Sequence, residues 1–181
     1  MNRRQFLYLL IPFCIALGFI LGFFAHGAFY SLHIVVSPEN GREILDFIDG
    51  ARQSLDVEVY FISSTEVTNA LIEAKRRGVD VRVIVDRGPY KEENTWVLER
   101  LSAAGIPVKF GVGCKTYHTK FIIRDGTDVL VGSHNLSHSA LYQNREVSLI
   151  LRNTLADEFM KIFEEDWQEG VYASISNSFP E

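Results

Sequence analysis

The stretch YHTKFIIRDGTDVLVGSHN, residues 117–135, decides how this chain folds and where its chemistry lies. His118 and Lys120 stand two positions apart, and on an extended strand this spacing points both side chains to the same face. A second apolar run follows, and a turn after it can bring Ser133 and Asn135 back beside that pair. The stretch therefore predicts one cluster built from two neighbouring strands.

The glycine at position 132 ends the second apolar run. Because glycine has no side chain, a phosphate group could approach the backbone closely there. An imidazole nucleophile, a cationic ammonium and neutral hydrogen-bond donors are the groups that a phosphodiester transition state requires. A lone His-x-Lys pair would more often be a solvated strand edge, and a site that only binds its ligand stays open as an alternative.

The stretch resembles the His-x-Lys-x4-Asp-x6-Gly-Ser-x-Asn signature of the phospholipase D superfamily, and every fixed position is matched. The flanking pattern is similar to this family from about Val35 to Trp167. Some members carry a single signature per polypeptide, among them a small secreted bacterial endonuclease and the mitochondrial cardiolipin hydrolases. This chain resembles that single-signature branch.

The resemblance implies a role for each signature residue. His118 would attack phosphorus and form a covalent phosphohistidine. Lys120 and Asn135 would hold the non-bridging oxygens, assisted by Ser133. Asp125 would be structural rather than chemical. A neutral imidazole is a competent nucleophile near pH 7, which agrees with the first role.

A nucleophilic histidine needs its second ring nitrogen held. Glu146 is the candidate orienting carboxylate, because the family often places an acid there. Beside Arg145 it could instead form a surface ion pair. Ser133 could likewise be a turn residue that caps the following segment.

The mechanism also needs a second histidine, to protonate the leaving oxygen and then activate water. Only one signature is present, so we expect a symmetric homodimer whose interface contains both copies of His118. His134 and His138 are alternatives for the acid, the second at the start of an expected surface helix. The signature contains no metal-ligand cluster, so we expect metal-independent chemistry without a cofactor.

The N-terminal segment, residues 1–32, has the pattern of a membrane anchor. Residues 6–32 contain no Asp, Glu, Lys or Arg, and this run is long enough to span a bilayer. A cleaved signal peptide is the alternative, which would leave the protein secreted or periplasmic. Because Arg3 and Arg4 precede the run, we expect a single-pass protein with its catalytic domain outside the cytoplasm. In an organelle the same anchor could leave the domain facing the cytosol.

The rest of the chain, residues 33–181, is expected to form one catalytic domain. Hydrophobic residues make up 47% of the sequence and charged residues 23%, as in ordinary globular proteins. This part holds 23 acidic against 16 basic residues, a balance of −7, which disfavours a general nucleic-acid binder. Cys114 is the one cysteine in it, so an intramolecular disulfide is not expected.

Short apolar runs alternate with amphipathic segments from His33 onward, which is typical of an α/β domain. We expect a mixed, mostly parallel sheet sandwiched between helices. The expected strands are 33–37, 55–62, 80–85, 108–110, 119–124, 129–132 and 147–151. The expected helices are 41–54, 64–77, 93–104 and 154–168, the last with Phe159, Ile162 and Phe163 as its core face.

The sequence therefore predicts a phosphodiester hydrolase that acts through phosphohistidine, with membrane phospholipid as the favoured substrate, because an anchor holds the domain near lipid. A nuclease is the first alternative, with a groove lined by Arg87, Lys91, Lys115 and Arg145. An alternative of another class is a non-catalytic membrane scaffold that binds phosphorylated ligands.

Overall fold

The computed structural model describes residues 12, 14, 15, 17, 18, 31–90 and 95–173. The chain separates into two compact units, Met1–Ser31 and Leu32–Glu181. In the first unit, residues 12, 14, 15, 17 and 18 are helical, and Ser31 begins the first strand. Most of the expected anchor lies outside the described residues, and no helix within the described part is long and apolar enough to cross a membrane.

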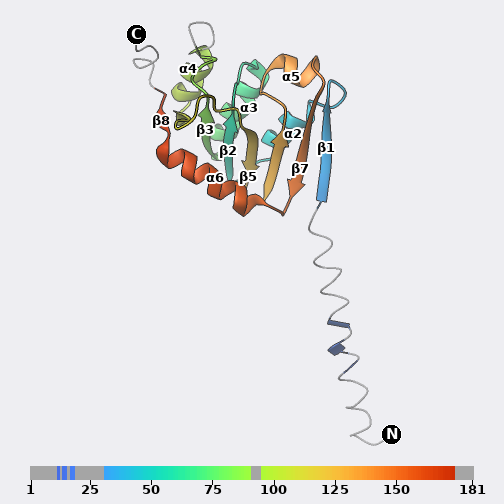
Figure 1. Ribbon diagram of the computed structural model, residues 1–181. Helices are drawn as coiled ribbons and strands as arrows, with labels where there is room; N and C mark the ends of the chain where they lie inside the picture. The colour runs from blue at the N-terminus through green and yellow to red at the C-terminus, as the bar shows by residue number, and fades with distance from the viewer. Residues whose placement is uncertain (1–11, 13, 16, 19–30, 91–94, 174–181) are drawn as a thin grey trace, which may run out of the picture. The chain divides into compact units, whose positions relative to one another are not determined.

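An eight-stranded sheet forms the second unit (Figure 1). Its strands are hydrogen-bonded in the order β1 (Ser31–Ser37), β7 (Glu146–Arg152), β6 (Asp128–Gly132), β5 (Lys120–Arg124), β2 (Ser54–Val59), β3 (Asp80–Val85), β4 (Val108–Phe110) and β8 (Val171–Tyr172). The central strands β2, β3 and β5 are rich in apolar residues, as strands covered on both faces must be.

The sheet is mixed, but the expectation that it is mostly parallel was wrong. Strands β2, β3 and β4 run parallel to one another. The pairs β2–β5, β5–β6, β6–β7 and β4–β8 are antiparallel. The reason is the length of the connections: only residues 125–127 join β5 to β6, and a parallel pair needs a crossover of a dozen or more residues.

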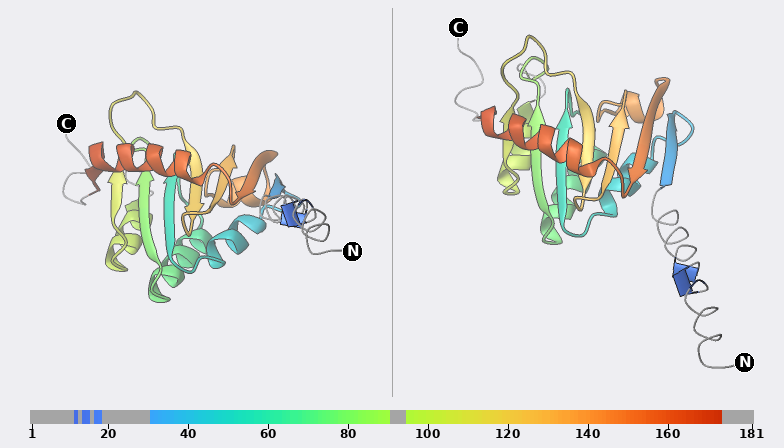
Figure 2. Two further views of the ribbon diagram at one scale, coloured as in Figure 1. Left: turned by 90° about the horizontal axis from the view of Figure 1, so that it is seen from below. Right: turned by 60° about the horizontal axis from the view of Figure 1, so that its bottom comes forward.

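Helices cover both faces of the sheet (Figure 2). One face carries α2 (Glu43–Asp49), α3 (Thr65–Arg76) and α4 (Thr95–Ala103), and the opposite face carries α6 (Ala156–Glu169). Helix α3 begins where the Ser64 side chain accepts a hydrogen bond from the Val67 amide, 3.3 Å away. The short helix α5 (His138–Tyr142) lies at one end of the sheet.

The two faces hold two hydrophobic cores. The larger core joins the sheet to α2, α3 and α4, and its fully buried side chains include Ile44, Leu71 and Leu101. The smaller core lies under α6 and centres on Phe163, which is 0% exposed. Ile162 is 45% exposed, so its expected place in the core was wrong. Consecutive helical residues point about 100° apart, and the face that holds Phe163 turns Ile162 toward solvent.

Candidate active site

All the signature residues except Asp125 lie at one edge of the sheet, because neighbouring strands there alternate in direction. Lys120 begins β5, Gly132 ends β6 and Glu146 begins β7. Neighbouring antiparallel strands bring the start of one beside the end of the next. These strand ends lie at the top of Figure 1 near α5 and form the candidate active site, which we call the site edge.

His118 lies in the segment just before β5, and its side chain is exposed. Its ring packs against Tyr60, with the ring centroids 4.8 Å apart and the planes tilted by 58°. Lys120 Nζ lies 5.4 Å from the centroid of the same Tyr60 ring and donates a hydrogen bond of 3.0 Å to the His118 carbonyl. His118 and Lys120, which the spacing predicted to point to the same face, thus both contact the ring of Tyr60.

Lys120 is the cation of the site, and its environment acts on its charge in two ways. Burial lowers the pKa of its ammonium, while the negative charge of Glu146 opposes this change. A partly buried ammonium attracts an anionic ligand more strongly than a fully exposed one does. Lys120 is therefore placed to attract a phosphate group.

Glu146 holds the turn that follows β6. Its Oε2 accepts a hydrogen bond from Ser133 Oγ, and Ser133 Oγ in turn accepts one of 3.0 Å from the Val147 amide. Its Oε1 accepts a longer bond of 3.4 Å from Asn144 Nδ2. In this arrangement Glu146 orients Ser133, and its expected role as the partner of His118 stays a prediction.

Packing against β7 requires a glycine at position 132, and the expected approach of a phosphate there stays a prediction. A Cβ at this position would lie 2.3 Å from Ser148 Oγ and 2.4 Å from the Val147 carbonyl oxygen, closer than any carbon can approach. The glycine therefore allows β6 and β7 to close against each other at the site edge.

Asn135 follows the turn on a segment that is tied to the end of β2. The Leu136 amide donates to the Phe61 carbonyl at 3.0 Å, and its carbonyl accepts from the amides of Ser63 and Ser64. Asn135 Oδ1 is buried and has no hydrogen-bond partner within the described residues. A buried amide oxygen without a partner is rare in proteins, and it marks Asn135 as a group available to a ligand or a second chain.

His134 is part of the interior of the protein. Only 2% of it is exposed, and its two ring nitrogens lie 2.7 Å from Ser37 Oγ and 2.7 Å from Ser148 Oγ. Ser37 Oγ donates to the Leu141 carbonyl, so it accepts from His134 Nε2, and Ser148 donates to Nδ1. Burial lowers the pKa of His134 and favours this neutral form. His138 is exposed at the start of α5, where its ring packs on Tyr142.

Asp125 lies at the opposite edge of the sheet, at the far end of β5. Its carboxylate accepts hydrogen bonds from the amides of Arg52, Gln53 and Ser54 at distances between 2.7 and 3.2 Å. It adopts a positive φ of 53°, a conformation that Asp tolerates better than most residues. These contacts fit the structural role that the resemblance implied.

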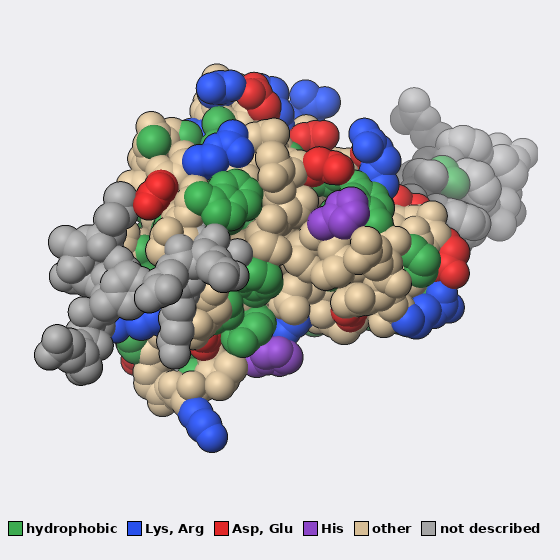
Figure 3. All heavy atoms as spheres, turned by 90° about the horizontal axis from the view of Figure 1, so that it is seen from above, with side chains coloured by type: hydrophobic (Ala, Val, Ile, Leu, Met, Phe, Trp, Pro, Cys, Tyr) green, Lys and Arg blue, Asp and Glu red, His purple; other side chains and the backbone are tan. Residues whose placement is uncertain are grey.

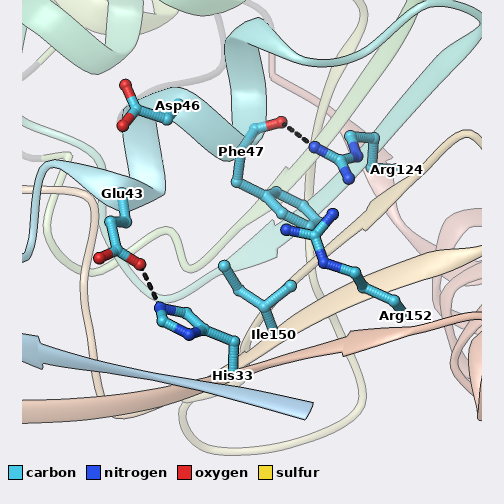
Figure 4. A pocket seen from close by; sticks show the side chains of 7 residues that line it. All are labelled: His33, Glu43, Asp46, Phe47, Arg124, Ile150 and Arg152. Carbon is cyan, nitrogen blue, oxygen red and sulfur yellow. Dashed lines mark hydrogen bonds and ion pairs between the residues drawn. The ribbon is translucent and has the colours of Figure 1, made fainter. Parts of the chain in front are cut away.

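A cavity of about 330 Å³ also lies at that opposite edge, away from His118 (Figure 4). Two of its basic groups have partners: His33 pairs with Glu43, and Arg124 donates to the Phe47 carbonyl at 3.2 Å and pairs with Asp128. It is lined by His33, Glu43, Asp46, Phe47, Arg124, Ile150 and Arg152. None of these residues belongs to the candidate active site, so the cavity is separate from it.

Sequence reasoning missed two residues that shape the site. Tyr60 directly follows β2, and Asp86 directly follows β3. Asp86 accepts a hydrogen bond of 2.5 Å from the amide of Tyr117, the neighbour of His118, and one of 2.7 Å from the Gly88 amide. Both residues lie at the carboxyl ends of parallel strands, where α/β proteins gather functional groups. This position could have identified them from the sequence.

The residues that the structure describes contain no group of three or more His, Cys, Asp or Glu side chains that could hold a metal ion. The site edge instead offers an imidazole, an ammonium, a hydroxyl and an amide. These groups can supply a nucleophile and hydrogen-bond donors for a phosphodiester.

The comparisons with known proteins agree with this fold and with the signature at the site. A family model described as "Cardiolipin synthase, PLD-like domain" matches residues 44–167. The chain belongs to this phospholipase D-like family.

Three similar proteins show the range of the family. The chain is 37% identical over 133 residues to a mitochondrial cardiolipin hydrolase of Xenopus laevis. This alignment covers 73% of this chain and 62% of that protein. It is 34% identical over 128 residues to a phospholipase D of Rickettsia bellii, covering 69% and 63%. Among solved structures, the phospholipase D family member Nuc from Salmonella typhimurium aligns with a TM-score of 0.76 and 30% identity, over 80% of this chain and 98% of that one. The chain spans about three fifths of the length of the two curated relatives.

Proposed function

We propose that this chain hydrolyses phosphodiester bonds of membrane phospholipids through a covalent phosphohistidine at His118. The observation that carries the proposal is the placement of an exposed His118 ring and the Lys120 ammonium on one Tyr60 ring. This geometry presents a nucleophile and a positive charge to the same ligand. The two relatives named for cardiolipin hydrolysis and phospholipase D support the substrate class.

The reaction has two displacements at phosphorus. In the first, a His118 ring nitrogen attacks, a nitrogen–phosphorus bond forms, and the alcohol leaves with a proton from a second histidine. In the second, that histidine takes a proton from water, whose oxygen displaces His118 and releases the phosphate monoester. The Lys120 ammonium and the side-chain Nδ2 of Asn135 donate hydrogen bonds to the equatorial oxygens on phosphorus and stabilise their charge. The Ser133 hydroxyl, which now donates to Glu146, contacts phosphate only after rotation.

The second histidine comes from the partner in a homodimer. His134, the nearest alternative in sequence, is buried and uses both ring nitrogens, so it has no proton to offer a leaving group. A symmetric interface that brings together two site edges places one His118 on each side of phosphorus. This supports a composite pocket with two equivalent histidines.

A lipid head group suits the charges around the site better than a nucleic-acid strand does. Arg145, one of the expected groove residues, has its Nη1 2.8 Å from both oxygens of Glu39, and Arg87 stacks over Phe110. Lys91 lies outside the described residues. Acidic and basic side chains are interspersed on the face that carries the site edge (Figure 3), and a strand of phosphates needs a continuous basic groove.

Membrane attachment through residues 1–32 completes the proposal, with the domain outside the cytoplasm. The full chain should resist carbonate extraction from membranes, and a mature soluble protein lacking these residues would show a cleaved signal instead.

The substrate is tested with a side-by-side panel. The full chain in detergent micelles is offered fluorescent cardiolipin, phosphatidylcholine, single-stranded DNA and bis(4-nitrophenyl) phosphate, with His118→Ala as the inactive control. We expect lipid cleavage that the variant lacks, and a phosphohistidine that can be trapped with acid. Cleavage of DNA but not lipid would make the chain a nuclease, and binding without turnover would make it a scaffold.

A further inference from the structure

Glu58 is a buried acid that the proposed reaction does not use. It lies near the end of β2 on the face covered by α6, and it is 0% exposed. Neither carboxyl oxygen has a hydrogen-bond partner within the described residues. An ionised carboxylate in such a place would be strongly unfavourable, because nothing replaces the water it has lost.

The surroundings of Glu58 are apolar or already paired, apart from the buried Thr119 hydroxyl, which has no partner within the described residues. Directly beside it in the sheet are Ile84 on β3 and Phe121 on β5, both part of the smaller core. The cations of this face are engaged: Arg82 bonds Asp56 at 2.7 Å and Glu164 at 2.6 Å, and Lys109 bonds the Trp167 carbonyl at 2.5 Å. The titratable and charged groups on the elements packed around it are Asp56, Arg82, Lys109, Cys114, Tyr117, Glu164 and Asp166.

These surroundings favour the neutral acid. Burial raises the pKa of Glu58 to about 8, the nearby Thr119 hydroxyl opposes the increase, and the negative charge of Asp166 adds to it. Glu58 therefore carries its proton at pH 7 and loses it in the mildly alkaline range.

The strand end that holds Glu58 also holds the reacting groups. Glu58 is two residues before Tyr60, whose amide donates to the Thr119 carbonyl at 2.9 Å. Thr119 stands between His118 and Lys120, and its hydroxyl is buried without a partner within the described residues. An ionised Glu58 would have to draw in water here and would loosen the contact between β2 and the segment before β5.

We propose that neutral Glu58 is a positioning residue: its protonated side chain keeps the ends of β2 and β5 closed, and this closure holds His118 and Lys120 against Tyr60. Loss of the proton opens the strand ends and turns the site off at alkaline pH. The measurement of activity against pH rests on the proposed hydrolysis. The measurement of the position of the His118 ring rests on its contact with Tyr60 alone.

The first experiment compares pH profiles of kcat for bis(4-nitrophenyl) phosphate hydrolysis by the full chain. Glu58→Gln mimics the neutral acid in size and lacks the titration, and Glu165→Gln, an exposed carboxylate on α6, is the matched control. We expect wild type and control to lose activity about tenfold per pH unit above about pH 8, and Glu58→Gln to keep its activity to higher pH. The same alkaline loss in all three proteins would overturn the proposal.

The second experiment needs no turnover, so it separates this proposal from the proposed function. The His118 ring signals are followed by NMR between pH 7 and 9, assigned by their loss in His118→Ala. We expect the wild-type signals to shift and broaden near pH 8, and those of Glu58→Gln to stay in place. If wild type is inactive at every pH but shows this difference, hydrolysis fails and the positioning role stands. Identical His118 signals in the two proteins would reduce Glu58 to a packing residue.

Discussion

The rings of Tyr60 and His118 lie with their centroids 4.8 Å apart, and Tyr60 is the one aromatic contact that the structure gives to the His118 ring within the described residues. His118 precedes β5 in an exposed segment, where few contacts would otherwise restrict its rotamers. Packing against Tyr60 restricts the orientations open to the His118 ring. The same ring attracts the Lys120 ammonium.

Replacing Tyr60 by Ala should therefore lower kcat more than it raises KM. We expect a loss of about 10- to 100-fold in kcat, because small displacements of a nucleophile are costly. Tyr60→Phe keeps the ring and should retain most of the activity. Steady-state kinetics on bis(4-nitrophenyl) phosphate make the comparison. Equal activity of the Ala and Phe variants would show that the ring does not position His118.

Mixing wild-type and His118→Ala chains tests the composite pocket. If each pocket needs both copies of His118, activity after subunit exchange follows the square of the wild-type fraction, about a quarter at equal mixing. If each chain works alone, the activity at equal mixing is about half. A fully active monomer at low concentration would transfer the role of general acid to the exposed His138.

Activity should survive metal chelators. The proposed chemistry uses a histidine nucleophile and cationic or amide donors, and none of its steps requires a Lewis acid. Hydrolysis is measured before and after dialysis against EDTA, with and without added divalent ions. Complete loss in EDTA and recovery with one of these ions would contradict the mechanism.

Asp125 should contribute to stability and not to chemistry. Asp125→Ala removes the acceptor for three backbone amides, and we expect a cost of about 2 kcal/mol and a fall in Tm of about 4–8 °C. At a temperature where the variant is folded, its kcat should stay close to wild type. A large loss of kcat in a folded variant would give Asp125 a functional role.

The same interaction predicts a dependence on pH. Burial acts to raise the pKa of Asp125, but the amides of Gln53, Arg52 and Ser54 and the charge of Arg124 outweigh it, so the folded-state pKa is lowered. A lowered folded-state pKa stabilises the protein above the unfolded-state pKa of about 3.8, and the benefit disappears as the pH falls through the folded value. The difference in Tm between wild type and Asp125→Asn should therefore be largest near neutral pH and shrink in acid.

The amino-acid sequence alone determined the parts of this protein that depend on neighbours along the chain. The apolar pattern placed β3 and β4 at the residues where the structure has them, and the Ser64 cap and Gly78 bounded α3 within a residue or two. The signature spacing predicted His118, Lys120 and Asn135 as a group, and the structure places His118 and Lys120 on one Tyr60 ring. Such signals are local, because periodicity and capping act within a turn of helix or a few strand residues.

The tertiary structure alone decided what depends on residues far apart in the chain. The antiparallel direction of β5, the packing of Tyr60 on His118 and the two serines around His134 join segments separated by 14 to 97 residues. Whether Glu58 is a surface acid or a buried one depends on where α6 crosses the sheet. No local pattern carries this information, because a side chain's partners are set by register and packing once the whole sheet has formed.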